Sequence, residues 1–193
     1  MHRRRVIRME ISSQKLQNII QDERVKETFI EQLIKEYHQS ITKLAYTYVK
    51  DQPLAEEVTQ DVFLTCFHKI ELFRNDSSIK TWLYRITINK CKDQLRKRKF
   101  IDLLMFQPDR NNQEVIETHH PESIVTANYE YKALSESVLS LPTKFKEVIY
   151  MHYYEEMKIQ EISQVLSIKI NTVKTRLNRG RNMLKEKYEE AIK

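Results

Sequence analysis

The scarcity of glycine is the feature that most constrains how this chain can fold. One glycine and four prolines occur among its 193 residues. Tight β-hairpin turns and glycine-rich phosphate loops therefore lack almost all of the residues that they require. P-loops and dinucleotide-binding sites need several glycines that let the backbone approach a phosphate. The composition thus predicts an all-α protein and excludes both classes of nucleotide site.

Helical periodicity predicts a compact bundle of three helices over residues 25–100. Apolar residues recur over residues 29–49 in one broad stripe, which is typical of a core-facing helix. Pro53 suits the first turn of a second helix that runs to about Ile70. A turn-rich loop, ELFRNDSS, then precedes a third helix that starts near Ile79. The predicted core stripe consists of Phe29, Leu33, Ile34, Tyr37, Ile41, Leu44, Ala45 and Tyr48.

Two segments that flank this bundle are predicted to lie outside it, and periodicity fails in the second of them, residues 101–128. Residues 1–24 begin with the basic run MHRRRVIR and are predicted to form a partly disordered N-terminal arm. No apolar stretch follows the run, so we expect no signal peptide, and Met1 and Met9 are both candidate start sites. Residues 101–128 hold five acidic residues and one arginine, a net charge of −4. This composition predicts a flexible acidic linker.

A second helical unit is predicted over residues 129–193. Periodicity returns in YEYKALSESVLSL and FKEVIYMHYYEE. A short helix (IQEISQVL), a tight connection (SIKI) and a longer helix (NTVKTRLNRGRNMLKEKY) follow, which is the pattern of a helix-turn-helix. Ser167 stands in the connection where glycine is more usual, so a left-handed conformation there would cost some strain. The predicted fold is two small helical domains joined by the acidic linker.

The last helix has an apolar side and a cationic side. Winding it at about 100° per residue groups Val173, Leu177, Gly180 and Leu184 on the side that packs on the preceding helices. In a helix-turn-helix the opposite side enters the major groove, where Arg and Lys meet guanine and Asn pairs with adenine. The alternative is an ordinary solvated helix face. The outward residues are Lys174, Thr175, Asn178, Arg179 and Arg181.

The third helix of the bundle carries a basic stripe opposite its apolar side. Cations hold phosphates, an indole replaces lost base stacking and an amide reads a base edge, so such a stripe suits single-stranded DNA. The alternative is that Trp82 belongs to the core and the cations only solubilise the surface. The stripe consists of Arg85, Asn89, Lys92 and Arg96, with Trp82, Ile86 and Asp93 along its edge; the apolar side consists of Leu83, Tyr84, Ile88, Cys91 and Leu95.

The second helix presents an acidic patch opposite its apolar side. The patch consists of Glu56, Glu57, Gln60 and Asp61. The whole chain has a net charge of +6, and an acidic surface on a basic DNA-binding protein should not face DNA. The patch is either ordinary solvated surface or a docking site for a basic protein partner.

Other kinds of site have little support. Cys66 and Cys91 lie far apart within apolar helical patterns and are predicted to be buried thiols. His119 and His120 have no partners at zinc-ligand spacing, so we expect no metal. No paired carboxylates stand beside the basic stripes, which argues against a nuclease. No window has the length of a membrane span. We expect a cytoplasmic protein that is not an enzyme, without cofactor or small-molecule substrate.

Two stretches of the chain resemble the bacterial RNA polymerase sigma factors of the extracytoplasmic-function (ECF) group. The first is LAEEVTQDVFLTCFHKIELFRNDSSIKTWLYRITINKCKDQLRKRK, and the second is LPTKFKEVIYMHYYEEMKIQEISQVLSIKINTVKTRLNRGR. They follow the family's order and spacing over most of residues 25–190. The resemblance implies an alternative sigma factor that binds core polymerase and directs promoter-specific initiation. A stand-alone helix-turn-helix repressor or activator is the alternative, and tight duplex binding without polymerase would favour it.

The resemblance also implies a role for each surface. Region 2 of the family grips the clamp helices of the polymerase β′ subunit and melts the −10 element; region 4 contacts the β flap and reads the −35 duplex. A membrane-anchored anti-sigma factor commonly holds family members inactive, and we expect one here. The matching positions are Glu57, Gln60 and Asp61 for polymerase; Phe73, Arg74, Trp82, Arg85, Asn89, Lys92 and Arg96 for the −10 element, with a flipped base near Phe73 and Asn89; and Asn171, Thr172, Lys174, Thr175, Asn178 and Arg179 for the −35 element.

Overall fold

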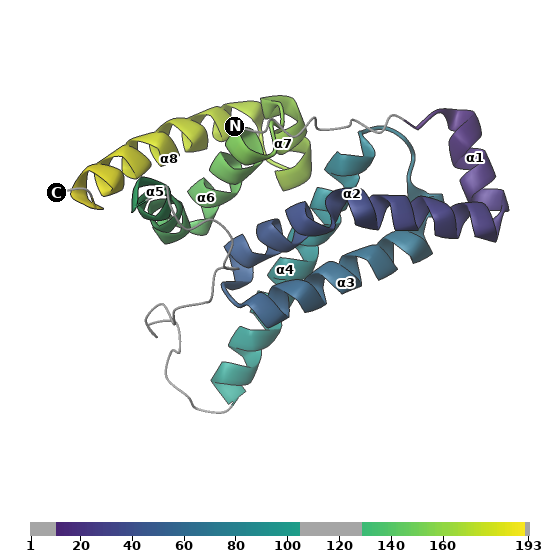
Figure 1. Cartoon of the computed structure of the whole chain (residues 1–193), viewed down its shortest axis with the longest axis horizontal. Helices are drawn as coiled ribbons and strands as arrows, with labels where there is room; N and C mark the ends of the chain where they lie inside the picture. The colour runs from purple at the N-terminus through teal and green to yellow at the C-terminus, as the bar shows by residue number, and fades with distance from the viewer. Residues whose placement is uncertain (1–10, 105–128, 192–193) are drawn as a thin grey trace.

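The structure, a computed structural model, describes residues 11–104 and 129–191. The regular elements of this part of the chain are all helices (Figure 1). They form an N-terminal unit, residues 11–104, and a C-terminal unit, residues 129–191, which pack against each other. The predicted all-α fold with two helical units is confirmed. Most of the predicted acidic linker and both His119 and His120 lie outside the described residues.

Four α-helices build the N-terminal unit. The Asp22 carboxylate caps α2 by accepting hydrogen bonds from the amides of Arg24 and Val25. Asp51 caps α3 in the same way, and Pro53 occupies the first turn as predicted. The elements are α1 (Ser13–Gln21), α2 (Glu23–Val49), α3 (Gln52–Lys69), the 3₁₀ turn η1 (Ile70–Leu72) and α4 (Ile79–Leu104).

The core of this unit is the predicted stripe of α2 packed against α3 and α4. Ile34 is the exception: it stands at the edge of the stripe and is 37% exposed, so its predicted core position is wrong. Helix α1 occupies residues 13–21 of the predicted arm and packs on α2, where Ile19 is fully buried. Short flanking helices of this kind are held by tertiary packing, which local sequence patterns reveal poorly.

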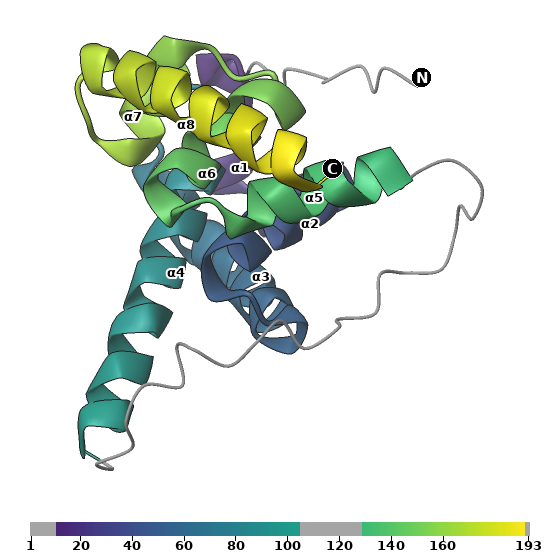
Figure 2. The same ribbon diagram turned by 90° about the vertical axis from the view of Figure 1, so that its left-hand side faces the viewer.

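Helix α4 extends to Leu104, four residues into the segment predicted as linker. Figure 2 shows its C-terminal half projecting from the rest of the N-terminal unit. Phe100 and Ile101 in this half are 62% and 49% exposed. The basic residues of α4 are thus carried partly on a helix that stands clear of its own bundle.

Five helical elements build the C-terminal unit. The helix IQEISQVL forms as predicted, and the turn after it places Ser167 in the left-handed region (φ 54°, ψ 44°), as expected. The Ser163 hydroxyl closes the turn by donating to the Ile168 carbonyl oxygen at 2.6 Å. The elements are α5 (Tyr129–Ser140), α6 (Thr143–Ile149), the π-helix η3 (Tyr150–Tyr154), α7 (Ile159–Leu166) and α8 (Ile170–Ala191).

The single glycine lies where α8 crosses α6. A Cβ at Gly180 would stand 3.1 Å from the Cγ1 atom of Ile149, which is itself 1% exposed. A side chain here would push into closely packed core. The only glycine of the sequence therefore serves the close packing of two helices and does not form a turn.

Candidate nucleic-acid and protein-binding surfaces

The helix-turn-helix separates a buried side of α8 from an exposed one. Val173 is fully buried and Leu177 is 4% exposed, so these residues hold α8 against the rest of the unit. The Thr175 hydroxyl donates to the Asn171 carbonyl oxygen at 2.9 Å. The side chains at the predicted groove-facing positions are all exposed except for the half-buried Thr172: they are Asn171, Lys174, Thr175, Asn178 and Arg179, with Arg181 beyond them.

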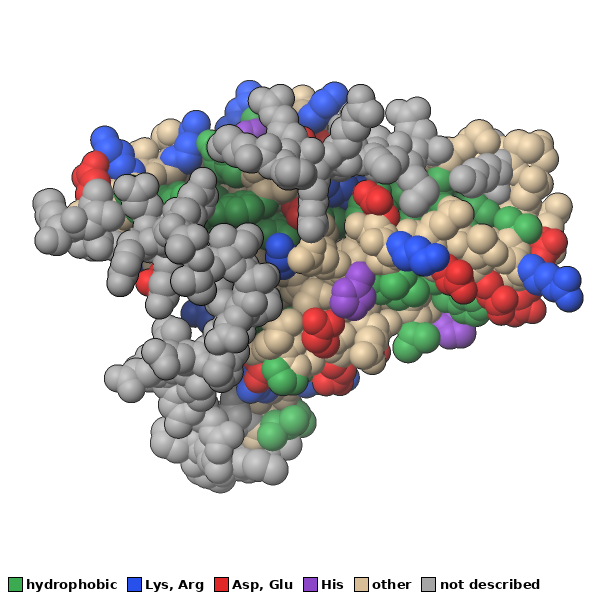
Figure 3. Space-filling model, viewed as in Figure 1, with side chains coloured by type: hydrophobic (Ala, Val, Ile, Leu, Met, Phe, Trp, Pro, Cys, Tyr) green, Lys and Arg blue, Asp and Glu red, His purple; other side chains and the backbone are tan. Residues whose placement is uncertain are grey.

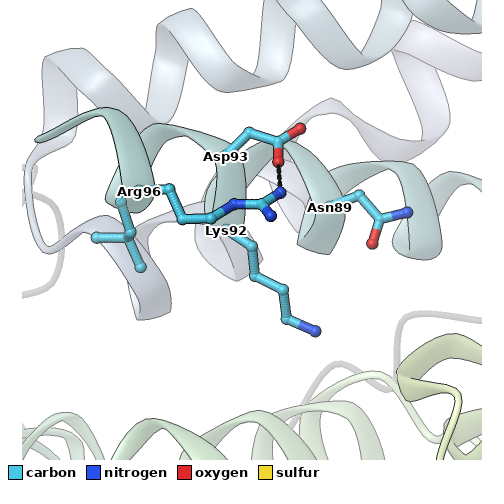
Figure 4. Close-up of a pocket in the computed structure, with 5 residues that line it drawn as sticks. Asn89, Lys92, Asp93 and Arg96 are labelled. Atoms are coloured by element: carbon cyan, nitrogen blue, oxygen red, sulfur yellow. Dashed lines mark hydrogen bonds and ion pairs between the residues drawn. The ribbon is translucent and has the colours of Figure 1, made fainter. Parts of the chain in front are cut away.

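The residues of the predicted basic stripe on α4 differ in how exposed their side chains are. Asn89, Lys92 and Arg96 are exposed, while Arg85 is half-buried. A surface cavity of about 520 Å³ lies along this stretch, and Figure 4 shows Asn89 and Lys92 pointing away from the helix there. Arg96 folds back along α4 and pairs with Asp93. Since both members of this pair are exposed, the pair contributes little to stability.

The two aromatic residues predicted at the −10 surface pack against each other. Phe73 is 4% exposed, and its ring centroid lies 5.3 Å from that of Trp82. Trp82 is half-buried and packs on the core. The Phe73 ring is therefore not displayed on the surface, and Trp82 combines a core contact with an exposed part. Arg74, next in the chain, is exposed.

Asn75 holds the loop before α4 and was not anticipated from the sequence. It adopts the left-handed conformation (φ 58°), and its Nδ2 atom donates to the Ile11 carbonyl oxygen at 2.8 Å. Asn tolerates this conformation better than most residues. The sequence signal was an Asn within a turn-rich loop, but its partner lies 64 positions away.

The acidic patch lies on one side of α3. Glu57 and Gln60 are exposed, whereas Asp61 is half-buried and pairs with Lys90 of α4 at 3.5 Å. Glu56 accepts a hydrogen bond from Gln52 at 3.0 Å. Figure 3 shows acidic side chains on this face of the N-terminal unit with exposed apolar ones among them.

Leu64 is an apolar residue on the same side of α3 that the sequence analysis did not single out. Helical winding places it between Glu57 and His68, and it is 58% exposed. Single exposed apolar side chains are common on protein surfaces, so Leu64 gains importance only if a partner covers this side of α3. The same winding of the sequence would have found it.

A polar seam joins the two units and was also not anticipated. Lys80 of α4 lies 3.0 Å from a carboxylate oxygen of Glu155, and its ammonium donates to the Glu155 carbonyl oxygen at 2.8 Å. The Tyr150 hydroxyl donates to the Glu155 carboxylate at 2.9 Å and lies 3.2 Å from the Ser40 carbonyl oxygen. We call these four residues the inter-unit seam.

Further chemistry is limited in the described part of the chain. Cys66 and Cys91 are free and buried, as predicted, and burial raises the pKa of each thiol to about 12. Such thiols stay protonated and are poor nucleophiles. The described residues contain no cluster of three metal-ligating side chains. None of the described helices has the length and apolarity needed to cross a bilayer.

Comparisons with known proteins agree with this geometry. The family model for sigma-70 region 2 matches residues 33–101, and the model for sigma-70 region 4 matches residues 131–184. The ECF RNA polymerase sigma factor SigW of Bacillus subtilis is 30% identical over 160 residues, covering 80% of this chain and 86% of that protein. SigV of the same organism is 29% identical over 152 residues, covering 79% and 86%.

Solved structures show the same fold. One is the sigma factor RpoE in complex with the anti-sigma factor NepR from Bartonella quintana, with a TM-score of 0.70, 20% identity and coverage of 82% of this chain and 96% of that one. Another is CnrH in complex with the cytosolic domain of CnrY, with a TM-score of 0.59, 20% identity and coverage of 89% and 92%.

Proposed function

The chain belongs to the ECF sigma factors of the sigma-70 family, and on this premise we propose which of its surfaces bind polymerase and promoter DNA. Its function is that of an alternative sigma factor, which directs promoter-specific transcription initiation. Sigma factors are not enzymes. The observation that carries the assignment of surfaces is the separation, on both α4 and α8, of a buried apolar side from a polar and cationic side.

The C-terminal unit reads the −35 element through α8. Its buried side anchors the helix, so the exposed side can enter the major groove as a rigid body. Lys174 and Arg179 supply donors for guanine or phosphate, and Asn178 can pair with adenine. The start of α8 carries Asn171, Thr172 and Thr175. Contacts to DNA phosphates are usual at the N-terminus of such a helix.

The N-terminal unit captures the opened −10 strand along α4. Asn89 reads a base edge, Arg85, Lys92 and Arg96 follow the strand's phosphates, and Arg74 approaches it from the preceding loop. Phe73 supports Trp82 from the core, so Trp82 offers the stacking surface. Unstacking costs a few kcal/mol per base step and is offset by contacts that form only with the opened strand. Binding thus drives strand separation, and polymerase performs the chemistry.

The acidic side of α3 docks on core polymerase. Glu57, Gln60 and Asp61 meet the β′ clamp helices, and the C-terminal unit meets the β flap. The related RpoE and CnrH structures each contain an anti-sigma factor or the cytosolic domain of a partner protein. We expect this chain to work in the cytoplasm under control of a comparable anti-sigma factor, which can hold it at the membrane.

Run-off transcription tests the proposal. Purified chain and sigma-free bacterial core polymerase are incubated with a library of genomic fragments, and each component is omitted in turn. Start sites that need both components support the proposal, and their upstream alignment yields both promoter elements. Asn89→Ala should then lose discrimination among −10 variants, by about 1–3 kcal/mol. If no start site depended on the chain, while the chain alone bound duplex DNA tightly, a repressor or activator would replace this proposal.

A further inference from the structure

We propose that Phe100 is a second stacking platform for the opened −10 strand, at the other end of the stripe from Trp82. This inference rests on the proposed function, because it assumes that the opened strand runs along α4. It goes further by adding an aromatic contact in the projecting half of the helix. It also limits how far that contact lies from the base that Asn89 reads. The ligand is unpaired DNA, which Phe100 recognises through the flat face of a base.

Phe100 is a large aromatic side chain that stands in solvent. It is 62% exposed and lies in the half of α4 that projects from the N-terminal unit (Figure 2). Phe73, by contrast, is 4% exposed. Leaving an aromatic ring in water forfeits the favourable free energy of burying it, so the ring is available to a partner. Exposure alone does not identify that partner, since single exposed apolar side chains are common.

Helical winding places Phe100 on the same side of α4 as the −10 stripe. Eighteen positions separate Trp82 from Phe100. At 3.6 residues per turn they make five full turns, so both aromatic side chains leave the helix in the same direction. The direction of Asn89 differs from theirs by about 20°. The two aromatic residues therefore stand at the two ends of one side of the helix, with the base-reading amide between them.

The charges around Phe100 favour a nucleic acid over an apolar protein surface. Within about one turn before it lie Arg96, Lys97 and Lys99, and all three side chains are exposed. An acid, Asp93, lies further back on the same side, and Arg96 pairs with it. An apolar protein partner would have to desolvate these cations, whereas DNA phosphates neutralise them. Surfaces that bind single strands combine cations for the backbone with aromatic rings for the bases.

The rise of the helix limits where the stacked base lies. Eleven positions separate Asn89 from Phe100, which is about 17 Å along the axis at 1.5 Å per residue. Bases that stay stacked are about 3.4 Å apart along one strand, so this length corresponds to about five nucleotides. A stretched strand covers the same length with fewer nucleotides. The base on Phe100 is therefore at most about five nucleotides from the base that Asn89 reads.

Four variants separate stacking from other roles of this side chain. Phe100→Ala removes the ring, Phe100→Leu keeps an apolar side chain without an aromatic face, and Phe100→Trp keeps the face. Ile101→Ala is the matched control, because Ile101 is 49% exposed at the next position and points about 100° away. Since both side chains are exposed, we expect every variant to fold, and circular dichroism verifies this.

The first readout is binding of a fluorescein-labelled dT20 strand to the free, full-length chain at fixed salt. Loss of one base–aromatic stack should weaken binding at least about fivefold in Phe100→Ala and Phe100→Leu. Phe100→Trp and Ile101→Ala should stay close to the unmodified chain. Affinity for core polymerase, measured by competition against a labelled sigma factor, should be unchanged in all four variants.

The second readout places the contact on a promoter. Core polymerase and the full-length chain are bound to a promoter found by run-off transcription, which carries 5-iodouracil at one position at a time. On irradiation, iodouracil crosslinks to an aromatic ring that stacks on it, and mass spectrometry identifies the residue. We expect a crosslink to Phe100 within about five nucleotides of the base whose identity Asn89→Ala no longer senses.

Three results would overturn the inference. The first is unchanged dT20 affinity of Phe100→Ala together with no crosslink to Phe100. The second is equal dT20 affinity of Phe100→Leu and the unmodified chain, because apolar area alone would then suffice. The third is a loss of affinity for core polymerase with unchanged dT20 affinity, which would make Phe100 a protein contact. Failure of the proposed function looks different, because the unmodified chain would then give no polymerase-dependent start sites, and this inference would fall with it.

Discussion

The Tyr48 hydroxyl on α2 donates a hydrogen bond to the carboxylate of Glu147 on α6, 99 positions later in the chain. Arg176 of α8 approaches the same carboxylate, with its Nη1 atom 2.7 Å from Oε1. Burial raises the pKa of the Tyr48 hydroxyl well above its ordinary value, so the hydroxyl keeps its proton and remains a donor. One carboxylate thereby joins helices of both units.

Replacing Tyr48 by Phe should lower the free energy of unfolding by about 1–2 kcal/mol, because a buried carboxylate loses a donor. Urea denaturation followed by circular dichroism measures the change. Tyr153→Phe serves as the control, since Tyr153 is 50% exposed and its change should stay within about 0.5 kcal/mol. Equal midpoints for Tyr48→Phe and the unmodified chain would show that this hydrogen bond contributes nothing to stability.

Ser167→Gly should stabilise the protein by about 0.5–1 kcal/mol. Ser167 is exposed and has a φ of 54°, a conformation that glycine adopts without steric cost. Ser167→Ala, which keeps the strain, is the control and should give no gain. The two variants are compared by their urea midpoints, and a Gly variant no more stable than the Ala variant would contradict the prediction.

Lys146 should make stability depend on pH. Burial, followed by the nearby Lys50 charge, lowers the pKa of Lys146 from 10.5 to about 8. Below pH 8 the amine is protonated in both the folded and unfolded states, so the folded state carries the full cost of burying the charge. Between pH 8 and 10.5 the folded state loses the proton first, and this cost declines.

The measurement is the difference in unfolding free energy between Lys146→Met and the unmodified chain at pH 7 and pH 9.5. The unfolding free energy of Lys146→Met minus that of the unmodified chain should be more positive at pH 7 than at pH 9.5. Taking the difference cancels the thiols and tyrosines, which titrate in both proteins. Lys144→Met, at an exposed position of the same helix, should show no such trend.

Leu64→Ala should weaken binding to core polymerase by about 1–2 kcal/mol, that is, by about five- to thirtyfold. Leu64 is 58% exposed, on the same side of α3 as Glu57 and one turn beyond Gln60. Leu72→Ala is the control, because Leu72 is 70% exposed but lies on η1, beyond that side. Competition against a labelled sigma factor measures both affinities. If both variants lost the same amount of affinity for core polymerase, Leu64 would have no specific role in binding it.

Arg179→Ala should lose about 1–3 kcal/mol of discrimination at one position of the −35 element. Arg179 lies on the exposed side of α8, within the first three turns. Lys185→Ala, further along the same helix, should lower transcription from all promoter variants about equally or leave it unchanged. Run-off transcription on a panel of −35 single-base variants separates the outcomes, and a uniform loss for Arg179→Ala would indicate a phosphate contact only.

Local patterns predicted most of the helices and the polarity of their sides. The helix Ile159–Leu166 and the left-handed Ser167 follow from residues within a few positions of each other. The buried side of α4 and the exposed side of α8 follow from winding alone. These features depend on helical geometry, in which each side chain's direction is set by its place in the sequence.

By itself, the sequence determined an all-α fold, the helix-turn-helix and the candidate surfaces, because each of these is encoded by composition or by short-range periodicity. Only the tertiary structure decided that Phe73 is buried behind Trp82, that Asn75 is tied to Ile11, and that Lys80 meets Glu155. Each of the last two contacts joins residues more than sixty positions apart. Such contacts depend on how whole helices pack, and no local period in the sequence reports the partner of a polar side chain.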